Sequence, residues 1–256
     1  MKVTDTAAII ARVRAEESEL PPEARLFVDP FARLFAGGLE RGDGADQFGA
    51  VPFLREAIRV RTKFIDDFVR RGTADGIRQI VILGAGFDCR ALRLEEIATT
   101  GSWVYEVDFA EQLATKRAVL DTAGVPIPKF VRFVPCDFTA DNFESLLSVG
   151  LAGEGFSAGA LTLFTWEGVI SYLNPSEIDR TLRWMASVGA PGSRVVFNYS
   201  INNLSGTDPD GMSSRAKAAG FSSVDDRSLG SLYREYLTAE PPSDVAELFR
   251  LAVSVR

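Results

Sequence analysis

The chain has 256 residues, of which 46% are hydrophobic and 25% charged, and its net charge is -7; this is the composition of a globular protein. The acidic balance disfavours non-specific binding to nucleic acid or to an anionic membrane surface, because no basic excess can displace condensed counterions. Histidine is absent, which excludes Ser-His-Asp and Cys-His hydrolases and histidine-based zinc sites.

The first 75 or so residues are predicted to be helical. Helical spacing of the apolar residues in 7–14 predicts a first helix that ends near Pro21. This segment lacks the apolar core and cleavage site of a signal peptide, and no apolar run approaches the roughly 18 residues of a membrane span. The two cysteines, Cys89 and Cys136, give no disulfide framework, so we expect a cytoplasmic protein. Together with the absence of histidine, the short apolar runs and the acidic balance, the sequence predicts no metal, membrane or nucleic-acid partner.

Two further helices are expected before the first strand. Asp29 precedes Pro30 and predicts a short helix with an aspartate cap and proline at its first position. A Gly- and Asp-rich loop at 37–49 separates it from a longer helix that begins near Phe53. That helix is predicted to end at Gly72, as a glycine cap.

Strands and helices alternate over the rest of the chain. Apolar runs predict strands at 79–83, 103–107, 130–134, 160–165, 194–199 and 249–255. Helices are predicted at 88–99, 109–123, 175–188, 212–219 and 229–237, with a Leu-rich segment that reaches 149 and a Gly-rich loop after it. This order predicts one α/β domain, with a mostly parallel sheet and helices on both faces.

The strongest local signal is QIVILGAGFDCRALRL, residues 79–94, in which a buried strand runs into a glycine loop and then a helix. Gly84 and Gly86 let the backbone turn sharply and let a ligand approach the main chain. A dinucleotide fingerprint requires a third glycine where Cys89 stands. Asp88 also disfavours a pyrophosphate there, so the loop favours an adenosyl cofactor over NAD.

Carboxylates at the ends of later strands extend this site. Asp108 follows Gly84 by 24 residues, near the spacing of about 20 at which an acidic residue binds ribose hydroxyls. Glu106 is a competing candidate two residues earlier. In PCDF (135–138), Asp137 can accept a bond from an adenine amino group while Phe138 covers the ring.

The fourth such signal is TWEGVISYL, residues 165–173, at the end of the fourth predicted strand. Glu167, Trp166 and Tyr172 place a charge beside two aromatic rings, as a small-molecule pocket does. The alternative for Trp166 is an ordinary core position.

Seven motifs in one order resemble the leucine carboxyl methyltransferase family, and in particular its bacterial branch of S-adenosyl-L-methionine-dependent methyltransferases. They are TAAIIARVRAEE, DPFARLF, VRTKFIDDF, VILGAGFDCRAL, VYEVDF, PCDF and WEGVISYL. The resemblance implies a Rossmann-like class I methyltransferase fold with a mostly parallel seven-stranded sheet. It also implies a single domain, with a helical cap at 1–75, a cofactor-binding core at 76–200 and a substrate-side segment at 201–256.

The resemblance also implies roles for single residues. The cofactor-loop glycine falls on Gly84, the ribose-binding acid on Asp108, the adenine-binding pair on Asp137 and Phe138, the acid after the fourth strand on Glu167, and the arginine for the methionine carboxylate on Arg61, with Arg14 as a second such contact. The sequence departs from the family at Cys89, where threonine is usual, and at 202–220, which is short for the family.

The expected reaction is methyl transfer from S-adenosyl-L-methionine to an oxygen of a small molecule. A carboxylate acceptor needs no base, which suits a chain without histidine. A phenol or hydroxyl acceptor would require one, and Tyr172, placed on the substrate side, and Glu167 are the candidates. The alternatives are an NAD(P)-dependent oxidoreductase on a similar sheet and an inactive cofactor-binding module.

Overall fold

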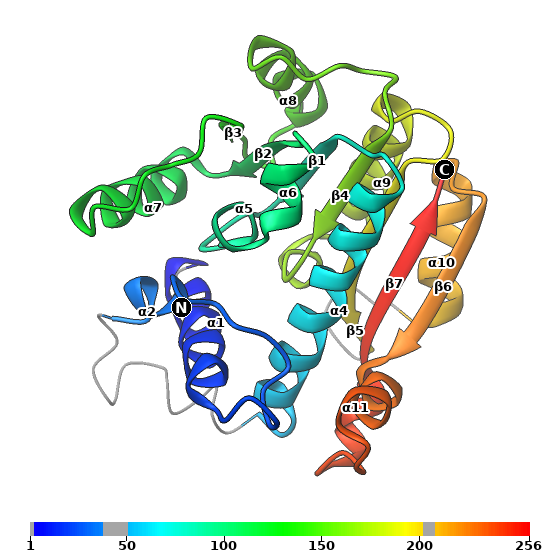
Figure 1. Cartoon of the computed structure of the whole chain (residues 1–256). Coiled ribbons are helices and arrows are strands. Elements are labelled where there is room, and N and C mark those ends of the chain that lie inside the picture. The colour runs from blue at the N-terminus through cyan, green and yellow to red at the C-terminus, as the bar shows by residue number, and fades with distance from the viewer. Residues whose placement is uncertain (1–2, 38–50, 202–207) are drawn as a thin grey trace.

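A seven-stranded sheet runs through the middle of the molecule (Figure 1). This computed structural model describes residues 3–37, 51–201 and 208–256. The strands are β1 (Gln79–Leu83), β2 (Trp103–Asp108), β3 (Val131–Pro135), β4 (Thr162–Trp166), β5 (Arg194–Ser200), β6 (Ser223–Ser228) and β7 (Phe249–Val255). Their order is β3-β2-β1-β4-β5-β7-β6; β7 runs antiparallel to both of its neighbours, β5 and β6, and the other described strand pairs are parallel. The mostly parallel α/β sheet is therefore confirmed.

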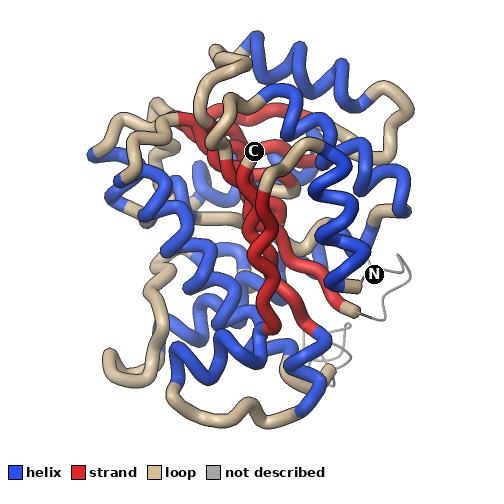
Figure 2. The backbone as a smooth tube through the Cα atoms, turned by 90° about the vertical axis from the view of Figure 1, so that its right-hand side faces the viewer, coloured by secondary structure: helices blue, strands red, loops and turns tan. Residues whose placement is uncertain are grey.

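Helices cover both faces of this sheet (Figure 2). They are α1 (Val3–Glu19), α2 (Ala32–Phe35), α4 (Leu54–Ala74), α5 (Arg90–Arg93), α6 (Glu95–Thr99), α7 (Ala110–Thr122), α8 (Phe143–Gly153), α9 (Pro175–Val188), α10 (Pro209–Ala219) and α11 (Leu229–Leu237), with short 3-10 turns at Ile170–Tyr172 and Asp244–Leu248. None of the described helices is long and apolar enough to span a membrane.

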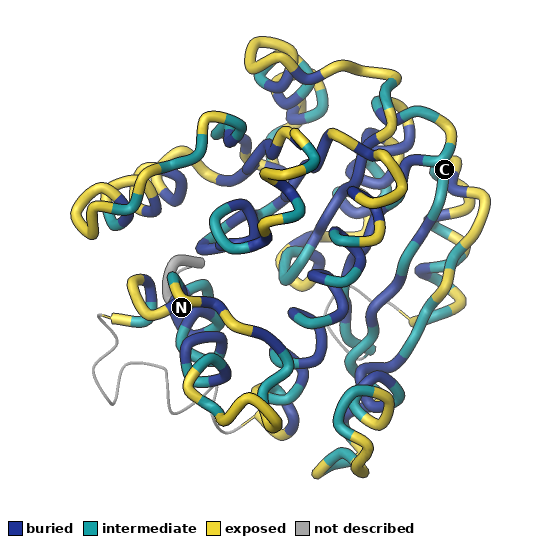
Figure 3. Tube along the Cα trace, in the orientation of Figure 1, coloured by how far each residue is buried: buried dark blue, intermediate teal, exposed yellow. Residues whose placement is uncertain are grey.

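Alternation along β1 divides the core into two layers. Ile80 and Ile82 pack in a cluster with α4, α6 and α11, whereas Val81 and Leu83 pack in a cluster with α8, α9 and α10. Figure 3 shows the resulting buried path along β1 and β4, with exposed turns on the outer helices. Trp166 is fully buried in the second cluster, so the core interpretation of this residue holds.

The region before β1 forms the expected helical cap in part. The Asp29 carboxylate accepts bonds from the amides of Phe31 and Ala32. The predicted cap at Asp29 with Pro30 as the first helical residue was nevertheless wrong, because α2 begins at Ala32, with Phe31 as its N-cap and no side-chain capping bond. The predicted loop at 37–49 lies, apart from Gly37, outside the described residues.

Two glycines that were expected to end or interrupt helices lie inside them. α4 continues through Gly72 to Ala74, and α8 continues through Gly150. A Cβ at Gly72 would lie 2.4 Å from the Leu163 side chain, and one at Gly150 would lie 2.9 Å from Val134. Both predictions were wrong because these glycines permit close packing of a helix on the sheet.

Two other elements differ from the prediction. The single helix expected at 88–99 is two short helices, α5 and α6, because Leu94 has an extended backbone. β6 was not predicted at all, since its sequence SVDDRS is polar and largely lies at the solvent-exposed edge of the sheet.

Candidate functional site

The loop after β1 turns on two glycines with left-handed backbone conformations. Gly84 has φ +71° and Gly86 has φ +47°. The amides of Gly84 and Ala85 donate to the Val107 carbonyl at 2.8 and 3.0 Å, which ties the loop to β2. A Cβ on Gly84 would lie 2.2 Å from a methyl of Val169. This position therefore requires glycine for both its conformation and its surroundings.

Asp108, the last residue of β2, faces this loop. Its Oδ2 accepts a bond from the Gly86 amide at 2.6 Å, and its Oδ1 accepts one from the Phe109 amide at 2.7 Å. Burial raises the pKa of Asp108, and these amides offset the rise only in part. The competing candidate, Glu106, is buried beside Lys116 at 2.5 Å and does not line the pocket described below.

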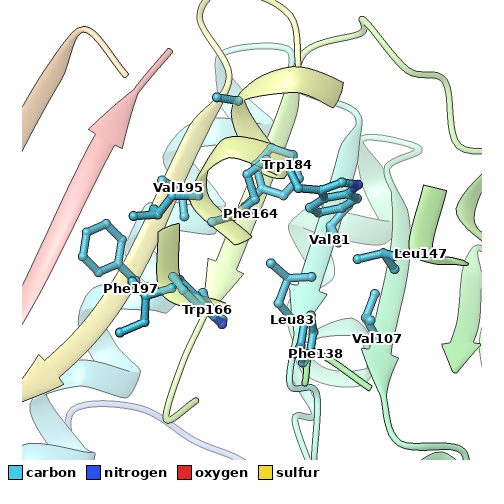
Figure 4. Packing of buried hydrophobic residues seen from close by; sticks show 14 of the residues in the cluster. Val81, Leu83, Val107, Phe138, Leu147, Phe164, Trp166, Trp184, Val195 and Phe197 are labelled. Carbon is cyan, nitrogen blue, oxygen red and sulfur yellow. The ribbon is translucent and has the colours of Figure 1, made fainter. Parts of the chain in front are cut away.

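The end of β3 brings Phe138 and Thr139 toward the same place. Phe138 is buried and packs edge-on against Phe143, with 5.9 Å between ring centroids; Figure 4 shows it beside Leu83. Asp137 is exposed, and its Oδ1 accepts bonds from the amide and hydroxyl of Thr139. Asp137 does not line the pocket.

Glu167, directly after β4, is held between two arginines. Its Oε1 lies 2.8 Å from Arg61 Nε and its Oε2 lies 2.9 Å from Arg90 Nη1. Burial alone would raise the pKa of Glu167, but these guanidiniums outweigh it and lower the pKa. Arg61 Nη2 is buried and has no hydrogen-bond partner within the described ranges.

Asp88, in the glycine loop, joins the same group of charges. It forms an ion pair with Arg90 and lies near Arg14 and Lys116. Burial opposes ionisation, yet the three cations lower the pKa of Asp88 to about 2. The carboxylate is therefore ionised over the physiological pH range.

One side of the site is formed by α1. Thr6, Ala7, Ile10 and Arg14 line the pocket from this helix. Opposite them, the half-exposed Tyr172 donates a hydrogen bond from its hydroxyl to Thr6 Oγ1 at 3.0 Å. The contact joins the N-terminal helix to the segment after β4.

These groups surround one pocket of about 170 Å³. Eight of the nine residues given a cofactor or substrate role from the sequence line it, namely Arg14, Arg61, Gly84, Gly86, Asp108, Phe138, Glu167 and Tyr172. Among the residues that the structure describes, no group of three or more His, Cys, Asp or Glu side chains is placed to hold a metal ion.

Sequence reasoning predicted Arg14 but missed Thr6, Ala7 and Ile10 from α1, and it missed two residues beside the predicted site residues. Thr6, Ile10 and Arg14 are four residues apart, so they lie on one helical face. That spacing was a usable signal for a pocket-lining face. Phe109 and Val169 also line the pocket. Both lie close to predicted site residues, Asp108 and Glu167, but their own apolar side chains were not predicted to belong to the site.

The sequence is similar to known proteins over most of its length. The profile of the leucine carboxyl methyltransferase family matches residues 7–186. A putative S-adenosyl-L-methionine-dependent methyltransferase of Frankia alni is 36% identical over 199 residues, which are 74% of this chain and 66% of that protein. A protein of the same description from Mycolicibacterium paratuberculosis is 31% identical over 241 residues, which are 86% of this chain and 74% of that protein. The chain thus spans just under two thirds of the Frankia protein.

The fold also matches a solved structure. A putative methyltransferase from Thermobifida fusca aligns with a TM-score of 0.57 and 16% identity, over 96% of this chain and 94% of that one. At this identity the match concerns the fold, and it agrees with the expected class I methyltransferase architecture.

Proposed function

Because this chain belongs to the leucine carboxyl methyltransferase family, we propose that it is an S-adenosyl-L-methionine-dependent O-methyltransferase that acts on a small molecule. The observation that carries the proposal is one pocket that unites the Gly84–Gly86 turn, the Asp108 carboxylate and the Nη2 of Arg61, which has no partner among the described residues. A buried guanidinium nitrogen without a partner is costly, and a ligand carboxylate would satisfy it.

The residues fit this cofactor group by group. Arg61 would bind the methionine carboxylate, with Arg14 as a second cation on the same pocket. Asp108 would accept bonds from the ribose hydroxyls, since each carboxylate oxygen has lone pairs beyond those given to the backbone amides. Phe138 would cover the adenine. We retain Asp137 as an adenine contact, because its bonds to Thr139 leave further acceptor capacity.

The charge of the lining supports the same choice of cofactor. Three carboxylates and two guanidiniums line the pocket, with a net charge of -1 when all are ionised: Asp88, Asp108, Glu167, Arg14 and Arg61. S-adenosyl-L-methionine carries a net charge of +1, whereas the pyrophosphate of NAD adds negative charge. Electrostatic complementarity therefore favours the sulfonium cofactor over the oxidoreductase alternative.

We propose a carboxylate as the acceptor group. When bound, the cofactor supplies an electrophilic methyl group on a sulfonium, so the protein has to align the acceptor oxygen with it. Glu167 is a poor base, since two arginines hold it ionised with a lowered pKa. Only Tyr172 remains from the two bases considered for a phenol or hydroxyl acceptor. A carboxylate acceptor avoids this requirement.

We further propose a cytoplasmic location and no nucleic-acid partner. The net charge of -7 disfavours binding to polyanions. Cys89 and Cys136 are both free, buried thiols, which suits a reducing compartment.

Calorimetric titration tests the proposed function. The wild-type protein is expected to bind S-adenosyl-L-methionine and S-adenosylhomocysteine and not NADH, and Asp108→Ala is expected to lose the adenosyl ligands. Glu111→Ala, an exposed residue of α7, serves as the control that retains binding. Failure of the wild-type protein to bind either adenosyl ligand would refute the proposal. A methyl-transfer screen of carboxylic acids against phenols then tests the acceptor.

A further inference from the structure

The two arginines that line the pocket are the ends of one buried chain of alternating charges. Arg61 comes from α4, which packs against the sheet, and Arg14 comes from α1 near the N-terminus. Figure 1 shows α1 at the lower left of the molecule, α5 above it, and α4 running alongside the strands. Five charged side chains connect them, in the order Glu167, Arg90, Asp66, Arg93 and Asp29.

The first half of the chain crosses from the pocket into the core. Arg61 contacts Glu167 at 2.8 Å, and Glu167 contacts Arg90 at 2.9 Å. Arg90 Nε then contacts Asp66 at 2.8 Å, while its Nη1 also binds Asp88. Arg90 thus joins three carboxylates from α4, the glycine loop and the end of β4.

The second half returns to the pocket through the cap. Asp66 accepts two bonds from Arg93, at 2.6 and 2.7 Å. Arg93 Nε lies 3.6 Å from Asp29 Oδ2, and Arg14 Nε lies 3.3 Å from the same oxygen. Arg14 also donates to the carbonyl of Phe87 in the glycine loop.

The chain is buried and electrically balanced. No side chain in it is more than 12% exposed. Its four cations and four anions, with Asp88 included, sum to zero. Buried charges are tolerated when they are paired, so each member depends on its neighbours for its position. The links from Asp29 to Arg93 and Arg14 are ion pairs without hydrogen bonds, whereas the links through Glu167, Arg90 and Asp66 are hydrogen-bonded.

We infer that Arg90 and Asp66 are positioning residues, which hold Arg61 and Arg14 as one unit against the carboxylate end of the cofactor. This inference rests on the proposed function. Neither residue lines the pocket; they act through Glu167 on one side and through Arg93 and Asp29 on the other. The adenosine end of the site, at Asp108 and Phe138, does not belong to the chain.

Two ligands separate positioning from general damage to the site. S-adenosylhomocysteine has the amino-acid carboxylate, whereas 5′-methylthioadenosine lacks it. We expect Arg90→Lys and Asp66→Asn to weaken S-adenosylhomocysteine binding by about tenfold and to leave 5′-methylthioadenosine binding nearly unchanged. Charge alone predicts the opposite for Asp66→Asn, since removal of an anion would favour the ligand carboxylate.

Matched controls are present at the far edge of the sheet. Asp226 accepts bonds from Tyr199 and Arg250, as Asp66 does from its two arginines, and this group does not line the pocket. Asp226→Asn and Arg250→Lys should therefore leave both ligands unaffected. Asp29→Asn is a milder variant of the chain, because the side-chain oxygen of an asparagine can still accept the bonds from the amides of Phe31 and Ala32.

The inference is overturned if folded variants bind both ligands as the wild type does, or lose both equally. If Asp66→Asn and Arg90→Lys do not fold, Asp29→Asn must show the same selective loss, and equal affinity for S-adenosylhomocysteine would overturn the inference. A wild-type protein that binds neither ligand instead refutes the proposed function, and the inference with it.

Discussion

Substitution of Gly84 by alanine tests whether the glycine loop is shaped by its backbone, by its contact with Val169, or by both. Gly84 has φ +71°, and a Cβ there would lie 2.2 Å from Val169 Cγ2. Gly86 is the matched comparison, because its φ is +47° and its nearest side-chain contact, Ala7 Cβ, would be an ordinary 3.5 Å away.

The two variants should differ in unfolding free energy. The left-handed conformation costs a residue with a Cβ about 1–2 kcal/mol, which applies to both positions. The overlap with Val169 adds about 1–3 kcal/mol of overpacking at Gly84 only. We therefore expect Gly84→Ala to lose about 2–5 kcal/mol and Gly86→Ala about 1–2 kcal/mol.

Urea denaturation of a double-mutant cycle with Val169→Ala measures the two contributions separately. Val169→Ala should recover about 1–3 kcal/mol of the Gly84→Ala loss and none of the Gly86→Ala loss. Equal losses for the two glycine variants, or purely additive effects of Gly84→Ala and Val169→Ala, would refute the steric reasoning.

Three other predictions follow from the site. The pKa of Asp88 is lowered from 3.8 to about 2, which gives about 2 kcal/mol of stability that is present above pH 3.8 and lost as the pH falls toward 2. The unfolding free energy measured in urea should therefore fall less steeply with acid in Asp88→Asn than in the wild type, and identical pH profiles would contradict this. Tyr172→Phe and Thr6→Val each remove one hydrogen bond and should each weaken S-adenosylhomocysteine binding with no further loss in the double variant; additive losses would show independent roles. Burial raises the pKa of both Cys89 and Cys136 to about 12, so neither thiol should react readily with a disulfide reagent at about pH 8 until the protein unfolds; rapid labelling of the native protein would rule this out.

The strands in the middle of the sheet were predictable because they are buried on both faces. QIVIL was assigned to residues 79–83, where the fully buried β1 lies. The final strand was assigned to 249–255, where β7 lies, although β7 is only partly buried. β6 escaped notice because its polar residues are those of an exposed edge, which hydrophobic patterning does not detect. Its place is set by pairing with β7, a tertiary contact.

Glycines have two different structural roles in this fold, and the local sequence predicted only one of them. Gly84 was assigned to a turn and has the positive φ that a turn requires. Gly72 and Gly150 lie inside helices, where the absence of a Cβ allows contact with Leu163 and Val134. The local sequence does not distinguish a turn from close helix packing, because both use the missing side chain of glycine. Close packing depends in addition on residues that are distant in the sequence.

The candidate site was predictable where its residues end strands. Asp108 and Glu167 lie at the same edge of the sheet because parallel strands present their carboxyl ends together. The contribution of α1 was not predictable in the same way, since the packing of Thr6 and Ile10 against the pocket depends on the cap. Arg90 was part of a quoted motif, but only the fold places it against Asp66 and Glu167.

The position of β7 also constrains the order in which the sheet can assemble. β7 pairs with both β5 and β6, and β6, which precedes it in the chain, has no other strand partner within the described ranges. During synthesis, β1 to β5 can therefore pair before β6 has anything to join. Amide protection in β6 should arise together with that in β7, which makes this edge of the sheet the last to become native.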